Sequence, residues 1–334
     1  MTSLLSPFAI GDLKLANRLV MAPMTRFRSP GGVPTAEVAD YYARRAAGGI
    51  GLIVTEGTLV GHPSASHETT VPRMTAGVAE AGWRLVTDAV HDTGGRIAAQ
   101  LWHLGSERRP VDGRESWTPS TMSVSDIDTI VEAFAESARV AVLAGFDAVE
   151  IHAAHGYLLD EFLWPVTNRR TDAYGADRSR FPAEVVRAVR AQLSPETPLI
   201  VRFSQFKERD YDARIAASPG ELESLLTPLA DAGADILHAS QRRFWEPAFA
   251  GSPLNLAGWA RKLTGLPSIT VGSVGLNGDL PELPRLLDGL STGEFDLVAA
   301  GRILLANPSW ASLLTSNRLA DVRGYQKSHE SVYF

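Results

Sequence analysis

The sequence predicts an α/β fold in which parallel strands close into a (β/α)₈ TIM barrel. Eight short apolar runs, rich in β-branched residues, recur along the chain, and segments with helical periodicity lie between them. Strands that are apolar on both faces are typical of a parallel sheet covered on both sides. Regular alternation of eight such units favours a closed barrel, and a doubly wound open sheet is the alternative.

The elements follow in a regular order. Residues 7–15, PFAIGDLKL, predict a short N-terminal hairpin that we expect to plug the barrel. The predicted strands are 18–24, 50–56, 96–103, 148–153, 199–204, 236–240, 268–274 and 297–302. Helical periodicity is clear over 35–47, 77–92, 126–144, 181–192 and 221–232. Several helices end in a glycine, which suits a C-terminal cap: Gly48, Gly94, Gly145 and Gly233.

Composition sets the broad class. We expect the 334 residues to form one barrel domain, 1–334, and 45% hydrophobic with 21% charged residues is typical of a soluble globular protein. The formal net charge of −6 argues against a general nucleic-acid or anionic-membrane binder. The N-terminus lacks the pattern of a signal peptide, and no apolar run is long enough to span a bilayer. The absence of cysteine excludes disulfides and thiolate zinc sites, and fits a cytoplasmic location.

The stretch 148–175 carries the densest chemistry. Its strand ends in His152, His155 and Tyr157. We expect the two imidazoles to reach one ligand, because a strand tip that turns into a helical coil places i and i+3 on the same side. A metal site and a pair of satisfied core histidines are the alternatives, and no further metal ligands are evident nearby. We favour two neutral N–H donors aimed at a substrate oxygen, with Tyr157 as a proton carrier.

The active site of such a barrel lies at the carboxyl ends of its strands. Glycines after the seventh and eighth predicted strands indicate a phosphate site, because bare backbone N–H groups can approach the anion there. Its candidate residues are Gly272, Ser273, Gly301 and Arg302.

Three polar residues on other strands suggest what else is bound. Thr25 offers a hydroxyl, Gln100 an amide and Arg202 a fixed cation. These groups suit a flat heteroaromatic ring with an amide-like edge, such as a reduced flavin. The alternative is that Gln100 and Arg202 bond to each other inside the barrel.

Five motifs carry a resemblance to a known family: MAPMTR (21–26), QLWHLG (100–105), AGFDAVEIHAAHGYLLDEFL (144–163), NRRTDAYG (168–175) and VAAGR (298–302). Over nearly the whole chain the sequence resembles the Old Yellow Enzyme family of flavin-dependent ene-reductases. The resemblance implies a (β/α)₈ barrel, FMN as cofactor and NADPH or NADH as reductant. It also implies a small enone-type substrate, and leaves open whether the protein is a monomer or a homo-oligomer.

The resemblance assigns roles by position. It implies cofactor-binding roles for Pro23, Met24, Thr25, Gly57, Gln100, Arg202, Gly272, Ser273, Gly301 and Arg302. It implies that His152 and His155 bind the oxygen of an α,β-unsaturated carbonyl. Hydride would pass from flavin N5 to the β-carbon, and Tyr157 would protonate the α-carbon.

Some features stay open. Ser106 stands where the family often has arginine, which leaves the roof of the substrate pocket uncertain. Four side chains after the fifth and sixth predicted strands either close over the substrate or only solvate loops: Lys207, Arg242, Arg243 and Trp245. Relatives that act on dienoyl thioesters or demethylate amines usually carry an iron–sulfur cluster, for which this chain has no cysteine. A barrel that binds FMN or a phosphorylated ligand without redox turnover is a third interpretation.

Overall fold

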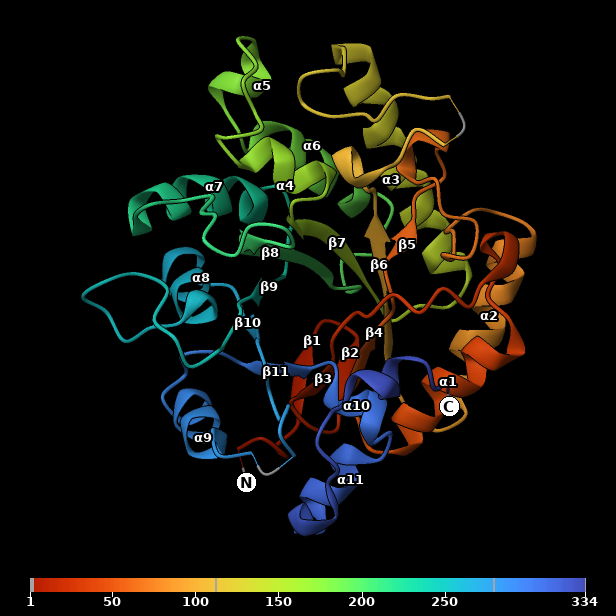
Figure 1. Cartoon of the computed structure of the whole chain (residues 1–334), viewed down its shortest axis with the longest axis vertical. Coiled ribbons are helices and arrows are strands. Elements are labelled where there is room, and N and C mark those ends of the chain that lie inside the picture. Colours follow the sequence, from red (N-terminus) through yellow and green to blue (C-terminus); the bar gives the residue numbers. More distant parts are fainter. Residues whose placement is uncertain (1–2, 112, 279, 334) are drawn as a thin grey trace.

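The computed structural model describes residues 3–111, 113–278 and 280–333. At its centre is a closed parallel barrel with helices outside it, as the sequence predicts (Figure 1). The barrel closes because β4 pairs with β6 through Ile53 opposite Ile97, so the open-sheet alternative is wrong. The eight barrel strands are β3 (Leu19–Met21), β4 (Leu52–Val54), β6 (Ile97–Trp102), β7 (Ala148–His155), β8 (Leu199–Lys207), β9 (Ile236–Ser240), β10 (Ser268–Val271) and β11 (Leu297–Ala300).

Helices connect the strands and cover the barrel from outside. A short strand, β5 (Thr58–Leu59), lies beside the end of β6. The helices are α1 (Ala36–Ala47), α2 (Val78–His91), α3 (Val124–Leu143), α4 (Leu158–Leu163), α5 (Ala173–Ala176), α6 (Arg180–Arg190), α7 (Pro219–Asp231), α8 (Leu256–Thr264), α9 (Leu283–Ser291), α10 (Ile303–Ala306) and α11 (Trp310–Thr315). All five helices predicted by periodicity are present, with ends that differ by a few residues.

Local chemistry explains where helices begin and end. Helix α3 begins at a capping box, in which the Ser123 hydroxyl accepts from the Asp126 N–H and the Asp126 carboxylate accepts from the Ser123 N–H. Gly145 then takes a left-handed φ of 88° just after α3, as predicted. Gly48 is the C-cap residue of α1, as predicted, with a φ of −72°. The left-handed residue after α1 is the next glycine, Gly49, with a φ of 90°.

The N-terminal hairpin plugs the barrel. Strands β1 (Phe8–Ile10) and β2 (Leu13–Leu15) pair antiparallel, and Leu13 and Leu15 are buried. They pack with the inward side chains of the barrel: Val20, Ala22, Leu52, Val54, Ala98, Ala148, Ile200, Ile236, Ile269, Val271, Leu297 and Ala299. The amino ends of the strands are therefore sealed by aliphatic side chains, and the carboxyl ends remain as the mouth.

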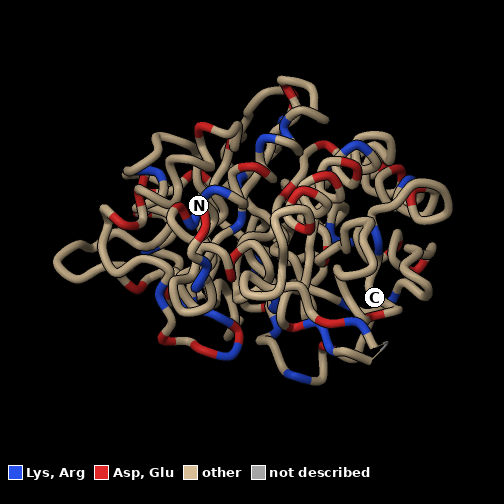
Figure 2. The backbone as a smooth tube through the Cα atoms, turned by 90° about the horizontal axis from the view of Figure 1, so that it is seen from above, with Lys and Arg blue, Asp and Glu red and all other residues tan. Residues whose placement is uncertain are grey.

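Charged residues are distributed over the whole molecule. Basic and acidic positions are interspersed along the backbone when it is viewed from above (Figure 2). Helix α3 has 20 residues but carries several charged side chains. Within the described residues, no helix combines the length and the hydrophobicity needed to cross a bilayer.

We expect Leu15→Ala to lower the free energy of unfolding by about 2–5 kcal/mol, because it leaves a cavity between the hairpin and the barrel interior. Chemical denaturation with spectroscopic detection measures the change. Lys14→Ala is the matched control, since Lys14 alternates to the exposed face of the same strand. A surface substitution of this kind changes stability by about 0.5 kcal/mol or less. Equal losses in the two variants would contradict the packing role of the plug.

Candidate active site

A cavity of about 530 Å³ opens at the carboxyl ends of the barrel strands, a volume typical of small-molecule sites. Eight of the predicted site residues line it: Pro23, Met24, His155, Arg202, Gly272, Ser273, Gly301 and Arg302. Other lining residues were not singled out from the sequence, among them Phe206, Glu208, Tyr211, Ser240, Gln241, Val271 and Leu276. Thr25, Gly57, Gln100, His152 and Tyr157 lie outside this lining.

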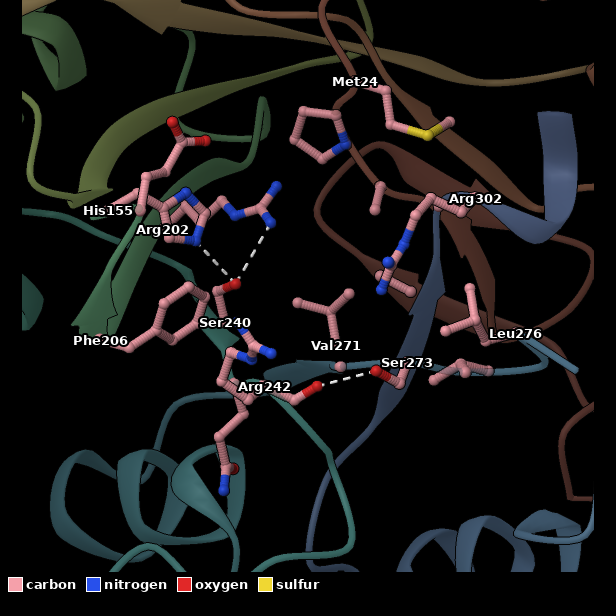
Figure 3. A pocket seen from close by; sticks show the side chains of 18 of the residues that line it. Met24, His155, Arg202, Phe206, Ser240, Arg242, Val271, Ser273, Leu276 and Arg302 are labelled. Atoms are coloured by element: carbon pink, nitrogen blue, oxygen red, sulfur yellow. Dashed lines mark hydrogen bonds between the residues drawn. The ribbon is translucent and has the colours of Figure 1, made fainter. Parts of the chain in front are cut away.

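One side of the cavity suits an anion. A side chain at Gly272 would place its Cβ 2.5 Å from the Gln241 carbonyl oxygen, so only glycine fits. Ser273 follows with a left-handed φ of 57°, and its hydroxyl donates to the Arg242 carbonyl at 2.9 Å. Arg302 approaches the cavity from the side opposite to Arg202 (Figure 3). No carboxylate in the described part of the chain forms an ion pair with Arg302, and its guanidinium lies 5.6 Å from the ring centroid of Tyr325.

Inside the barrel, Gln100 does not bond to Arg202. Its amide donates instead to Glu150 Oε1 at 2.8 Å, and His238 Nδ1 lies 2.6 Å from Glu150 Oε2. Burial alone would raise the pKa of Glu150, but His238, Arg202 and the Gln100 amide outweigh burial and hold that pKa below its usual value. Sequence reasoning missed Glu150 and His238. Strand alternation was the available signal, because Glu150 lies two residues before His152.

The two predicted histidines meet, but for a different reason from the one expected. Strand β7 continues to His155, and its register with β8 shifts between Ala153 and His155. In a regular strand i and i+3 face opposite sides. The irregularity and a left-handed φ of 66° at His155 bring its ring within 5.3 Å of the His152 ring. The helical coil expected at the tip begins only at α4.

Hydrogen bonds hold His155 in this conformation. Its N–H donates to the Ser204 hydroxyl at 2.9 Å, and its carbonyl accepts from the Glu208 N–H at 3.1 Å. Its Nε2 lies 2.8 Å from Ser240 Oγ, which also accepts from Arg202 at 3.4 Å (Figure 3). Ser240 therefore joins the predicted cation to one of the predicted histidines.

Burial keeps both imidazoles neutral. Burial first, and then the charge of Arg202, lower the pKa of His152 and of His155 well below the usual value. The Nδ1 atom of His152 is buried and has no partner within the described residues. A neutral imidazole with an unpartnered nitrogen is suited to bind a ligand that enters from the cavity.

Tyr157 and Trp102 complete this side of the site. Tyr157 is the N-cap residue of α4, and its ring lies 5.0 Å from the His152 ring and 4.9 Å from the Trp102 ring. Burial, and then the carboxylate of Glu208, raise the pKa of the Tyr157 phenol far above its usual value, so the phenol keeps its proton. Trp102 also packs on Gly57, where a Cβ would lie 2.5 Å from the indole ring. Thr25 is half-buried, one residue beyond Met24.

Comparisons with known proteins decide the family. The model of the NADH:flavin oxidoreductase / NADH oxidase family matches residues 3–321. The chain belongs to this family. It is 34% identical to 12-oxophytodienoate reductase 7 of Oryza sativa subsp. japonica, with 91% of this chain and 86% of that protein covered. It is 31% identical to an NADH oxidase of Thermoanaerobacter brockii, where 96% of this chain spans only 52% of that protein.

Solved structures of relatives agree with this membership. Morphinone reductase in complex with tetrahydroNAD has a TM-score of 0.83 and 30% identity, with 98% of this chain and 93% of that chain covered. An old yellow enzyme homologue from Zymomonas mobilis has a TM-score of 0.82 and 25% identity, with 99% of each chain covered. The protein is thus an FMN-dependent NAD(P)H oxidoreductase of the Old Yellow Enzyme type.

The cavity of this family member fits its cofactor. Arg202 has a buried Nε without a partner among the described residues, as an atom that awaits a ligand would have. Gly272 and Gly301 line the opposite wall, beside Arg302. A cation at each side of the cavity, with glycine backbone beside Arg302, matches the two anionic parts of reduced FMN, its ring and its phosphate.

The four side chains whose role the sequence left undecided have different positions in the structure. Lys207 neither covers the cavity nor solvates a loop, because it is buried and forms an ion pair with Asp160 at 2.5 Å. Arg243 is exposed and pairs with Glu246, and Trp245 packs on Phe244. Of the four, only Arg242 lines the cavity, where its guanidinium stacks on the ring of Tyr211 at 3.5 Å.

The turn that carries Ser106 is held from below by Glu161 of α4. The Ser106 N–H donates to Glu161 Oε1 at 3.2 Å, while Oε2 is buried without a partner in the described residues. Burial raises the pKa of Glu161 to about 8. The carboxyl group is therefore protonated at neutral pH, which is compatible with its position beneath the turn.

We expect Glu161→Gln to change how stability depends on pH. The folded-state pKa of Glu161 is raised, so its contribution is fully present below the unfolded pKa near 4.5 and is lost as pH rises through about 8. The difference in unfolding free energy, variant minus wild type, should grow by about 1.4 kcal/mol per pH unit between these limits. Denaturant titrations at pH 5.5, 6.5 and 7.5 measure it. Parallel stability curves would show that Glu161 is ionised in the folded protein.

Proposed function

We propose that this protein is an ene-reductase, which reduces the carbon–carbon double bond of an α,β-unsaturated carbonyl compound at the expense of NAD(P)H. One observation carries the proposal: two neutral imidazoles and a protonated phenol converge beside the cavity that fits FMN. Two N–H donors are suited to a carbonyl oxygen, and a nearby phenol is suited to a carbon that must gain a proton.

The assignment of cofactor contacts joins residues that line the cavity with Thr25, Gly57 and Gln100, which lie outside its lining. Pro23, Met24, Thr25 and Gly57 would line the isoalloxazine ring. Gln100 and Arg202 would face its pyrimidine edge, where the guanidinium charge stabilises the reduced anion. Gly272, Ser273, Gly301 and Arg302 would hold the phosphate through backbone N–H groups and a guanidinium. FMN, when bound, supplies the two-electron chemistry that links NAD(P)H to the substrate.

The protein's own residues then act on the substrate. His152 and His155 bind the carbonyl oxygen and stabilise the negative charge that grows on it as the β-carbon is reduced. Their low pKa values keep them neutral, so no proton is lost to the developing enolate. Tyr157 transfers its proton to the α-carbon, which is far more basic than a phenolate. Glu208 lies beside the phenol and is exposed to solvent.

We expect Tyr157→Phe to slow reduction of an enone by about 10²–10⁴-fold while it spares reduction of the flavin by NADPH or NADH. Anaerobic visible spectroscopy separates the two steps. The yellow band should bleach with the nicotinamide at the wild-type rate, and then return slowly when 2-cyclohexenone is added. An equal loss of rate in both steps would contradict the proton-donor role of Tyr157. A wild-type protein that stays colourless with added FMN would overturn the proposed function itself.

We expect the double variant His152→Ala/His155→Ala to lose affinity for phenols, which mimic the enolate, by at least about 100-fold, since two charge-assisted hydrogen bonds are removed. Titration of the oxidised flavoprotein with a para-substituted phenol, followed by its long-wavelength charge-transfer band, measures the affinity. Ser204→Ala tests for effects of the backbone near His155, because the Ser204 hydroxyl accepts from the His155 N–H and donates to the Phe206 carbonyl. Unchanged phenol affinity in the double variant would show that the histidines are structural.

A further inference from the structure

Glu150 is a buried carboxylate inside the barrel, one layer below the two histidines. It lies on β7, two residues before His152, and its side chain is 0% exposed. It accepts from Gln100 at 2.8 Å and contacts His238 Nδ1 at 2.6 Å. These contacts join β6, β7 and β9. In the strand register Glu150 pairs with Ile200 of β8, and Arg202, two residues further along β8, pairs with His152 and His238.

The negative charge of Glu150 is stabilised by specific neighbours. A buried carboxylate is costly unless donors and a countercharge surround it. His238 and Gln100 supply the donors, and the third group is Arg202, because Glu150 and Arg202 each favour the ionised form of the other. Gln100 and Arg202 are the two residues that we assign to the pyrimidine edge of the flavin. Glu150 therefore forms a hydrogen bond with Gln100 and offsets the charge of Arg202.

On the basis of the proposed function, we propose that Glu150 is a positioning residue that fixes the Gln100 amide, offsets the charge of Arg202 and thereby sets the reduction potential of the bound flavin. Arg202 alone would stabilise the reduced anion and raise the potential. The carboxylate of Glu150 opposes that stabilisation. A flavin with a lower potential gives up its electrons to an alkene more readily.

A purely structural role makes a different prediction. If the contact between Glu150 and His238 only holds strands together, its loss lowers stability and leaves the flavin potential unchanged. Glu150→Gln tests this because the two side chains have nearly the same shape. The new amide oxygen can still accept from Gln100, and the new NH₂ can donate to the other tautomer of His238. The substitution therefore removes the charge and keeps the hydrogen bonds.

We expect the midpoint potential of bound FMN to rise by about 30 mV in Glu150→Gln, which corresponds to a tenfold change in the two-electron equilibrium constant. Reductive titration against a reference dye, on the holoprotein, measures it. Glu294→Gln is the matched control, because Glu294 is a half-buried acid in an ion pair with Arg285 on the outside of the barrel. The control should keep the wild-type potential. An unchanged potential in folded, FMN-loaded Glu150→Gln overturns the proposal.

Glu150→Asp separates position from charge and also covers the case in which Glu150→Gln does not fold. It keeps the carboxylate but withdraws it from Gln100. We expect the two-electron equilibrium constant, calculated from the midpoint potential, to stay within about twofold of the wild-type value. FMN binding should become about tenfold weaker, as measured by the fluorescence of released FMN. Wild-type FMN affinity in this variant overturns the positioning role. If wild type itself binds FMN but does not reduce enones, the proposed function fails, and the potentials still test Glu150.

Discussion

Closure of the barrel through the pairing of β4 with β6 is the constraint on which the rest of the structure depends. All eight strands are parallel, so closure brings every carboxyl end to one rim. Residues far apart in the chain then become neighbours, and a Cβ at Gly301 would lie 3.3 Å from the Met24 sulfur. The hairpin seals the other rim. The cavity thus follows from closure and the plug together, and no local motif contains it.

Alternation along the strands divides the barrel interior into two layers. The lower layer is aliphatic and packs with the hairpin. The layer above it is polar on four strands. Its residues each follow a residue of the lower layer by two positions: Gln100, Glu150, Arg202 and His238. Polar groups in such a place are tolerated only when they satisfy one another. Gln100, Glu150 and His238 Nδ1 do so before a ligand arrives, while Arg202 Nε has no partner in the described residues. The polar layer is therefore organised in advance for a charged ring, which is how electrostatic stabilisation in an enzyme works best.

Two residues with a strained backbone lie at the rim. His155 and Ser273 both have left-handed φ values, 66° and 57°, without being glycine. Such residues cost about 1–3 kcal/mol each and persist only where surrounding contacts hold them. Ser204, Ser240 and the Glu208 backbone hold His155, and the Arg242 carbonyl holds Ser273. In both cases the strained backbone turns a strand end toward the cavity. The strain lowers the stability of the fold, and it places a side chain at the cavity.

The sequence by itself determined the barrel strands, the hairpin, five of the helices and the family, because apolar periodicity and contiguous motifs are local properties of a chain. It also identified the residues at the strand ends, since a parallel barrel places them on one rim. Only the tertiary structure decided their partners. From the sequence, Lys207 could be a solvent-exposed charge, yet in the structure it is buried and paired with Asp160. His238 is 88 residues from Glu150, and the position of His155 depends on a shift in strand register. Burial, register and hydrogen-bond partners arise from long-range contacts, which a local pattern does not encode.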